Sequence, residues 1–216
     1  MSLIRKQCLI KKYQKVPMKI STLFLCITAL LLSGCSSTMD MRKISVEPKI
    51  STENIRKSSL KAGLILNDQF TSYKYNFETG KQLYLLAKVR GEIDIGKNLS
   101  NALYGIVSSK FKSVSMGSNI NEIDDVDIYF VPRIKSFEFS PPYTGMGSYT
   151  AAIELETEIF NGDGKLQHRI NIKQDGSRST FNQFALKTNY DMAYGAVNEA
   201  INNTLEEFSV KLNEYY

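Results

Sequence analysis

The chain has 216 residues, 43% of them hydrophobic, and a formal net charge of +5 at pH 7. Six of the 27 basic residues and none of the 22 acidic residues precede position 35, so the rest of the chain has 21 basic residues and is close to neutral. This balance argues against a nucleic-acid-binding protein, and the length after position 35 suits one domain with a proper hydrophobic core.

The N-terminal segment has the three parts of a secretory signal. Its positive charges come first, and an apolar run from Leu23 to Leu32 follows, interrupted only by Thr28. That run is too short for a helix that spans a bilayer, which needs roughly 20 apolar residues. The same shortness disfavours the alternative of a signal anchor with an incidental cysteine. Met1 and Met18 are both compatible with this signal as translation starts.

The apolar run ends in Leu32-Ser33-Gly34-Cys35, which resembles the lipobox of bacterial lipoproteins. The resemblance implies that the thiol of Cys35 receives a diacylglycerol and that residues 1–34 are removed as a signal peptide. It also implies that the new amino group is acylated, with a fatty acid such as palmitate. Because Cys8 and Cys26 leave with the signal, we expect no disulfide and no cysteine-based metal site in the mature protein.

The stretch after the lipobox is polar and has no apolar period. We interpret residues 35–58 as the lipidated cysteine followed by a flexible tether. Residues 59–216 are then expected to form a single domain.

Apolar patterns predict the first elements of that domain. Residues 62–66 read as a buried strand, residues 73–77 alternate as a half-buried strand, and residues 84–87 suggest a third. A helix is predicted from Ile95 to Phe111, because its apolar residues recur at spacings of three and four, and Asp94 is its expected N-cap.

The second half of the domain begins with a predicted central strand at residues 127–139, since the apolar run there indicates that both faces are covered. A hairpin is predicted around Asn161-Gly162-Asp163-Gly164, with paired residue numbers that sum to 325. A long amphipathic helix from Tyr190 to Leu212 follows. The order predicts an α+β fold, an antiparallel or mixed sheet with two helices packed on one face.

Several polar groups are candidates for catalytic or ligand-binding sites. Glu154, Glu156 and Glu158 share one strand face, and we interpret them as a solvated face paired with Arg169 and Lys165 rather than as a cation site. The single histidine, His168, is expected to point inward opposite Thr157 in a structural role. The acidic run at residues 124–127 lacks the spacing of a calcium loop, and Gly145-Met146-Gly147 lacks that of a phosphate loop. We therefore expect no enzyme activity, no cofactor and no metal.

The segment Ser140–Tyr149 invites an interaction hypothesis. It joins two predicted strands and carries Tyr143, Met146 and Tyr149, residue types that are favoured at the centres of protein interfaces. A loop folded back on the sheet is the equally weighted alternative. The C-terminal Tyr215 and Tyr216 form a weaker second candidate.

The layout of the domain resembles a group of small bacterial outer-membrane lipoproteins. It is similar to the lipopolysaccharide-assembly lipoprotein, the YajG-type lipoproteins and the auxiliary lipoproteins of lipid-transport ABC systems. The resemblance is one of order, without a diagnostic motif. It is carried by residues 62–66 with Phe70 and Tyr73, the helix at residues 99–111, residues 127–132 and 137–141, the hairpin at Gly164-Lys165, and the last helix.

The resemblance implies a non-enzymatic protein that serves a partner at the cell envelope, although it transfers no partner-binding residue and fold alone does not fix function. Ser36 stands where many inner-membrane lipoproteins have Asp, which implies an outer-membrane lipoprotein that faces the periplasm. The expected partners are the membrane, through the lipid, and an envelope protein. A lipid- or peptidoglycan-binding module is the alternative, and a hydrolase with an unrecognised site is a weaker third.

Overall fold

The computed structural model describes residues 38–40, 43–45, 47–49, 57–78, 88–142, 147–180 and 186–216. The predicted signal, Cys35 and the strand expected at residues 84–87 lie outside them. Two sheets and two long helices make up the described part of the chain.

The larger sheet has five strands in the order β6 (Ser113–Gly117), β3 (Lys61–Ile65), β7 (Ile128–Ser140), β8 (Gly147–Asn161) and β9 (Leu166–Thr180). Strand β3 runs parallel to both of its neighbours, whereas β7, β8 and β9 are antiparallel. The prediction that residues 127–139 form a central strand is confirmed.

The smaller sheet is built around β5 (Lys88–Asp94). Strand β4 (Lys74–Glu78) pairs with one edge of β5 in antiparallel orientation. On the other side, β1 (Thr38–Asp40) and β2 (Ile44–Ser45) pair with β5 in parallel orientation. The sequence predicted neither of these two short strands.

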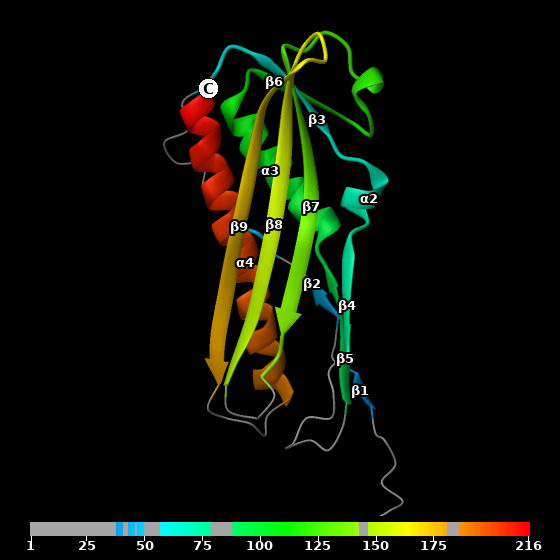
Figure 1. Ribbon diagram of the computed structural model, residues 1–216, viewed down its shortest axis with the longest axis vertical. Coiled ribbons are helices and arrows are strands. Elements are labelled where there is room, and N and C mark those ends of the chain that lie inside the picture. The colour runs from blue at the N-terminus through cyan, green and yellow to red at the C-terminus, as the bar shows by residue number, and fades with distance from the viewer. Residues whose placement is uncertain are drawn as a thin grey trace, which may run out of the picture. The chain divides into compact units, whose positions relative to one another are not determined.

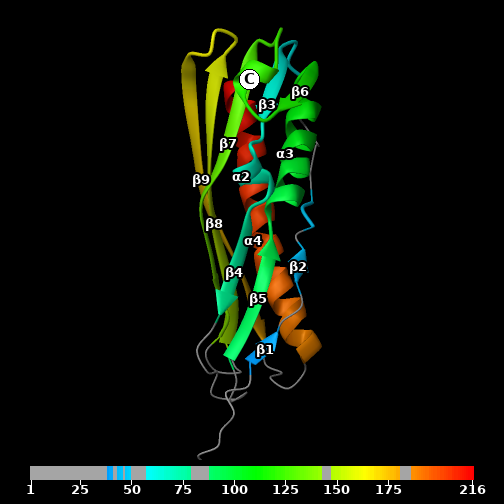
Figure 2. The same cartoon turned by 90° about the vertical axis from the view of Figure 1, so that its right-hand side faces the viewer.

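Two long helices, α3 (Gly96–Lys110) and α4 (Leu186–Tyr215), lie on one face of the larger sheet (Figures 1 and 2). The smaller sheet continues the layer of α3, as Figure 2 shows. The short α2 (Asp68–Thr71) precedes β4, and a 3-10 helix (Ile120–Glu122) follows β6. The predicted α+β fold with a mixed sheet and two helices on one face is confirmed.

The helices bury the apolar stripes that predicted them. In α3 these are Leu99, Leu103, Ile106 and Val107, all in the core between the layers. The expected N-cap was wrong, because the N-cap of α3 is Ile95, with no side-chain cap. Asp94 instead ends β5, where its carboxylate bonds a lysine of the N-terminal segment.

The hairpin between β8 and β9 is confirmed, but its register differs from the prediction by two residues. Leu155 pairs with Ile172 and Glu158 with Arg169, so the paired numbers sum to 327. A bulge between Ile159 and Phe160 accounts for the irregular turn. Away from the bulge, a shift of two leaves the side chains on their predicted faces, because the period of a strand is two. At the bulge, Leu166 pairs with Phe160 in place of Ile159.

Candidate functional site

The N-terminal segment, here residues 38–40, 43–45 and 47–49, is docked on the domain. Ile44 is 0% exposed and belongs to the main core, opposite Ile93 of β5. Beside it the ammonium group of Lys43 lies 2.7 Å from Asp94 and 3.3 Å from Glu92. The hydrogen bond to Asp94, supported by Glu92, raises the pKa of Lys43. One buried apolar side chain and one ion pair therefore hold the segment against β5.

Helix α4 holds the same segment from the other side. The backbone N–H of Glu47 donates to the Asn198 side chain at 2.7 Å, and that of Lys49 donates to Asn202 at 2.8 Å. Asn198 and Asn202 are four residues apart, so they lie on one face of the helix. The predicted flexible tether is wrong for this segment, because its backbone is bound by β5 and α4. What remains between Cys35 and the first bound residue is two serines.

Two tyrosines complete this clamp. The hydroxyl of Tyr194 donates to the carboxylate of Glu47 at 2.8 Å, and that of Tyr190 donates to the carbonyl of Lys43 at 3.3 Å. Burial, and then the hydrogen bond to Glu47, raises the pKa of Tyr194 to about 12. Its hydroxyl therefore stays protonated near neutral pH and can keep donating.

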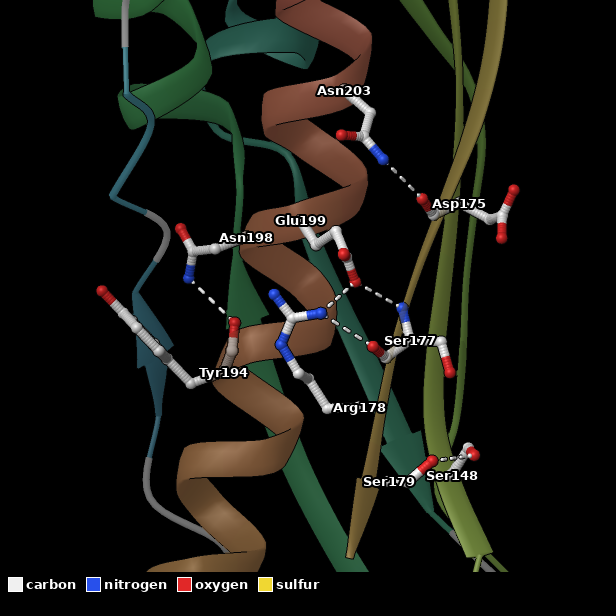
Figure 3. A network of polar contacts seen from close by, with 9 residues as sticks. All are labelled: Ser148, Asp175, Ser177, Arg178, Ser179, Tyr194, Asn198, Glu199 and Asn203. Atoms are coloured by element: carbon white, nitrogen blue, oxygen red, sulfur yellow. Dashed lines mark hydrogen bonds and ion pairs between the residues drawn. The ribbon is translucent and has the colours of Figure 1, made fainter.

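A second polar network covers the free edge of β9, the last strand of the larger sheet. Figure 3 shows side chains of α4 reaching the outward backbone groups of that strand. Three bonds do this: Lys211 to the carbonyl of Asn171 (3.1 Å), Asn203 to the carbonyl of Asp175 (3.0 Å), and the N–H of Ser177 to Glu199 (2.8 Å). An uncovered edge is a template for pairing with another chain, and these side chains occupy part of it.

Close packing of the helix makes this network feasible. A Cβ atom on Gly176 would collide with the backbone of Ala196 and Ala200, so only glycine lets α4 lie this near β9. Glu199 also bonds Arg178 at 2.5 Å (Figure 3). The bond to Arg178, together with the N–H of Ser177, lowers the pKa of Glu199.

Among the residues proposed from sequence, Cys35, Tyr143 and Met146 lie outside the described part of the chain. Tyr149 is described and is only 3% exposed, in the core, stacked against Phe139 with ring centroids 6.2 Å apart. Its place in an exposed partner-binding loop is therefore wrong in this structure. Its ring faces the same side of β8 as Ala151 and Ile153, because alternate strand residues share a face.

The three glutamates of β8 lie on the outer face of the sheet, as predicted. Arg133 and Arg169 reach Glu158 at 3.1 and 2.5 Å, while Arg169 and Lys135 lie 3.7 and 3.8 Å from Glu156. The predicted pairing with Arg169 is confirmed, but Glu158 is only 8% exposed, so the prediction of a solvated face is wrong at this position. The described part of the chain holds no group of three or more His, Asp or Glu residues that could bind a metal ion.

His168 lies on the predicted inner face but opposite Ile159, near the turn, where it is exposed and stacked on Tyr215 with centroids 4.6 Å apart. The hydrogen bonds of the acidic run close the loop before β7, since Asp127 accepts from the backbone of Lys61 at 2.7 Å and Asp125 from its ammonium group. His168 and the acidic run therefore each have structural partners within the domain.

Two surface depressions are open to small molecules. One, of about 310 Å³, lies between α3 and the end of β6 and includes Ser100 and Met116. The other, of about 430 Å³, lies beside α2 and β7 and includes Tyr73, Arg133 and Lys135. The two cations of the second are the ion-pair partners of Glu158 and Glu156. Of the helices in the described residues, none is both long and apolar enough to cross a membrane.

The clamp on the N-terminal segment is the feature that sequence reasoning missed. Two signals for it were present in the sequence. Ile44 is one of several apolar residues in the mostly polar stretch after Cys35, and Asn198 and Asn202 recur at helical spacing between apolar residues.

Comparison with known proteins gives a fold likeness only. No family model and no curated protein matches the chain. A solved protein of Xanthomonas campestris, from the DUF330 family, is 12% identical, with a TM-score of 0.47 over 82% of this chain and 100% of that one. A minor lipoprotein of Acinetobacter baumannii is 10% identical, with a TM-score of 0.45 over 74% and 95%. Both TM-scores lie below 0.5, so these likenesses carry no functional conclusion.

Proposed function

We propose that the protein is a lipoprotein of the outer membrane whose domain faces the periplasm and serves an envelope complex as a non-enzymatic accessory or adaptor. The observation that carries this proposal is the sequence Leu32-Ser33-Gly34-Cys35 at the end of a short apolar run. Removal of residues 1–34 leaves a nearly neutral domain attached through the lipid on Cys35. The residue after it, Ser36, supports the outer membrane by the resemblance stated above.

A binding role is supported by what the polar clusters of the domain do. The glutamates of β8 bond neighbouring cations, and the asparagines and tyrosines of α4 bond the N-terminal segment. These groups are engaged in holding the structure, whereas catalysis needs a group with a reactive neighbour and room for a substrate.

The lipid anchor is tested by the intact mass of the protein extracted from membranes, beside a Cys35→Ser variant. A mature chain that begins at residue 35 and carries acyl mass, both lost in the variant, is the expected result. A soluble chain without acyl mass, or one that retains residues 1–34, would refute the proposal.

The adaptor role is tested by crosslinking the lipidated protein in cells and purifying the product. We expect one protein partner in a fixed ratio, and its complex should fail to assemble when this chain is deleted. Co-purified lipid or glycan in place of a protein would favour the alternative of a lipid- or peptidoglycan-binding module.

The loop with Tyr143 and Met146 remains a proposed contact in that complex. Replacing both residues with Ser should lower the crosslinking yield, whereas Tyr104→Ser on the exposed face of α3 should not, since Tyr104 is 39% exposed and lies on another element. Equal yields from both variants would remove the loop from the proposal.

A further inference from the structure

One end of the domain brings together Thr38, the first described residue after Cys35, and the ends of several strands that are distant in sequence. The register pairs Thr38 with Lys88, Ser140 with Thr150, and Gly147 with Thr180. The two sheets meet there, because Phe77 of β4 lies 4.8 Å from Phe139 of β7, measured between ring centroids. We call this the proximal end; it is the lower end in Figures 1 and 2.

The chain between the proposed lipid and the proximal end is very short. Two residues, and so three Cα–Cα steps, separate Cys35 from Thr38, which allows a Cα–Cα span of at most about 11 Å. The polar layer of one bilayer leaflet is roughly 5–8 Å thick, from the difference between the whole bilayer and its hydrocarbon core. A lipidated Cys35 can therefore hold Thr38 only a few ångströms beyond the headgroups.

The docked segment cannot lengthen this connection while it stays bound. Ile44 is in the core, and Glu47 and Lys49 are bonded to α4 through their backbones. Release would expose Ile44 and break the hydrogen bonds and ion pairs of the clamp together. The reach thus remains that of the two serines at positions 36 and 37.

The outer face of the sheet also changes character toward the proximal end. Its distal part, near the β8–β9 turn, carries the ion pairs of Arg133, Glu158 and Arg169, which are costly to press against lipid because they would lose water. Toward the proximal end, cross-strand neighbours on this face are hydroxyl residues. They are Ser140, Ser148, Thr150, Ser177 and Ser179. Uncharged hydroxyls lose less on contact with headgroups and can hydrogen bond to them.

We infer that the proximal end lies against the lipid headgroups and that the β8–β9 turn points away from the membrane. This inference rests on the proposed lipidation of Cys35. A strand of the length of β8, 15 residues, spans about 50 Å. The turn at Asp163 therefore stands up to that distance from the bilayer, whereas a partner that contacts the loop between Ser140 and Gly147 must bind close to the membrane surface.

Single-cysteine labelling tests the orientation, because Cys35 is the only cysteine of the mature chain and its thiol is blocked by lipid. Ser179→Cys and Asp163→Cys place a fluorophore at opposite ends of one hairpin, both at exposed positions. The lipidated proteins are reconstituted in phosphatidylethanolamine–phosphatidylglycerol vesicles that carry a nitroxide on the headgroup. We expect the label at position 179 to lose most of its fluorescence and the label at position 163 to keep it.

Equal quenching at both positions, or quenching at position 163 alone, would overturn the inference. A variant with 20 Gly/Ser residues inserted between Ser37 and Thr38 should regain fluorescence at position 179, because the linker adds roughly 25 Å of reach. Quenching that survives the insertion would overturn the account by tether length. The acyl mass of the same samples is measured in parallel, so a missing lipid, which refutes the proposed function, is distinguished from a lipidated protein in another orientation.

Discussion

Two strand edges of this protein are covered in different ways. The edge of β5 is covered by backbone, since β1 and β2 add to it as short parallel strands. The edge of β9 is covered by side chains, since Glu199, Asn203 and Lys211 of α4 bond its backbone groups. A backbone cover is lost as one unit when its anchor is removed, whereas a side-chain cover can be dismantled one bond at a time.

The largest effect is expected from Ile44→Ala, which removes the anchor of the backbone cover. Truncating a fully buried isoleucine to alanine lowers the free energy of unfolding by about 2–5 kcal/mol. The loss is smaller if the segment can leave its site while the rest of the domain stays folded. We expect urea unfolding to show the loss, and hydrogen exchange at Ser45 to approach that of an unbound chain. Leu166→Ala, at a 44% exposed position, is the control and should change little. Unchanged protection at Ser45 would show that the segment does not depend on this anchor.

A smaller effect is expected when the side-chain cover is removed. Asn203→Ala should cost about 1 kcal/mol, the usual net contribution of one hydrogen bond. Adding Glu199→Ala and Lys211→Ala should lower stability in steps and leave the edge open, so that sedimentation velocity detects self-association. Glu206→Ala, at an exposed position of the same helix, should do neither. A triple variant that remains as stable and monomeric as the parent would contradict the role of this network.

Acid should loosen the edge of β9 through protonation of Glu199. The folded-state pKa of Glu199 is lowered by Arg178, so its contribution is present above the ordinary carboxyl pKa and is lost as pH falls through the lowered value. The protection factor of the Ser177 amide, the exchange rate of an unstructured chain divided by that of this amide at the same pH, is expected to fall over that range in the wild type. In Glu199→Gln, protection at Ser177 should be weaker and should no longer change over this pH range.

Alkali should loosen the clamp on the N-terminal segment, and this is the smallest of the expected effects. Because the pKa of Tyr194 is raised to about 12, its contribution is present below the ordinary tyrosine value near 10 and is lost as pH rises toward 12. The ultraviolet titration of tyrosinate should lose its latest-titrating component in Tyr194→Phe. If that component persists, another tyrosine is responsible and the hydrogen bond to Glu47 does not control the clamp.

The period of the apolar residues was sufficient to predict the elements that bury one regular apolar face. The stripe of α3, the alternation in β4 and the apolar run of β7 each predicted the right element, because burial of one face imposes the period. The hairpin faces were also right, although its register differed by two, since the bulge at Ile159 does not alter which side is apolar. Propensity could not place the N-cap of α3, because Asp94 is bound by Lys43 from a distant part of the chain.

The sequence by itself determined the α+β class and the faces of the long elements, since each follows from local composition and period, and it is also the source of the proposed lipidation of Cys35. The tertiary structure alone decided that residues 38–40, 43–45 and 47–49 lie bound in place of a tether, that Tyr149 belongs to the core, and that α4 covers β9. These depend on partners about 150 positions away, such as Glu47 with Asn198, or on close approach at Gly176. A pattern of neighbouring residues contains no information on such distances, because they are set by how the layers pack.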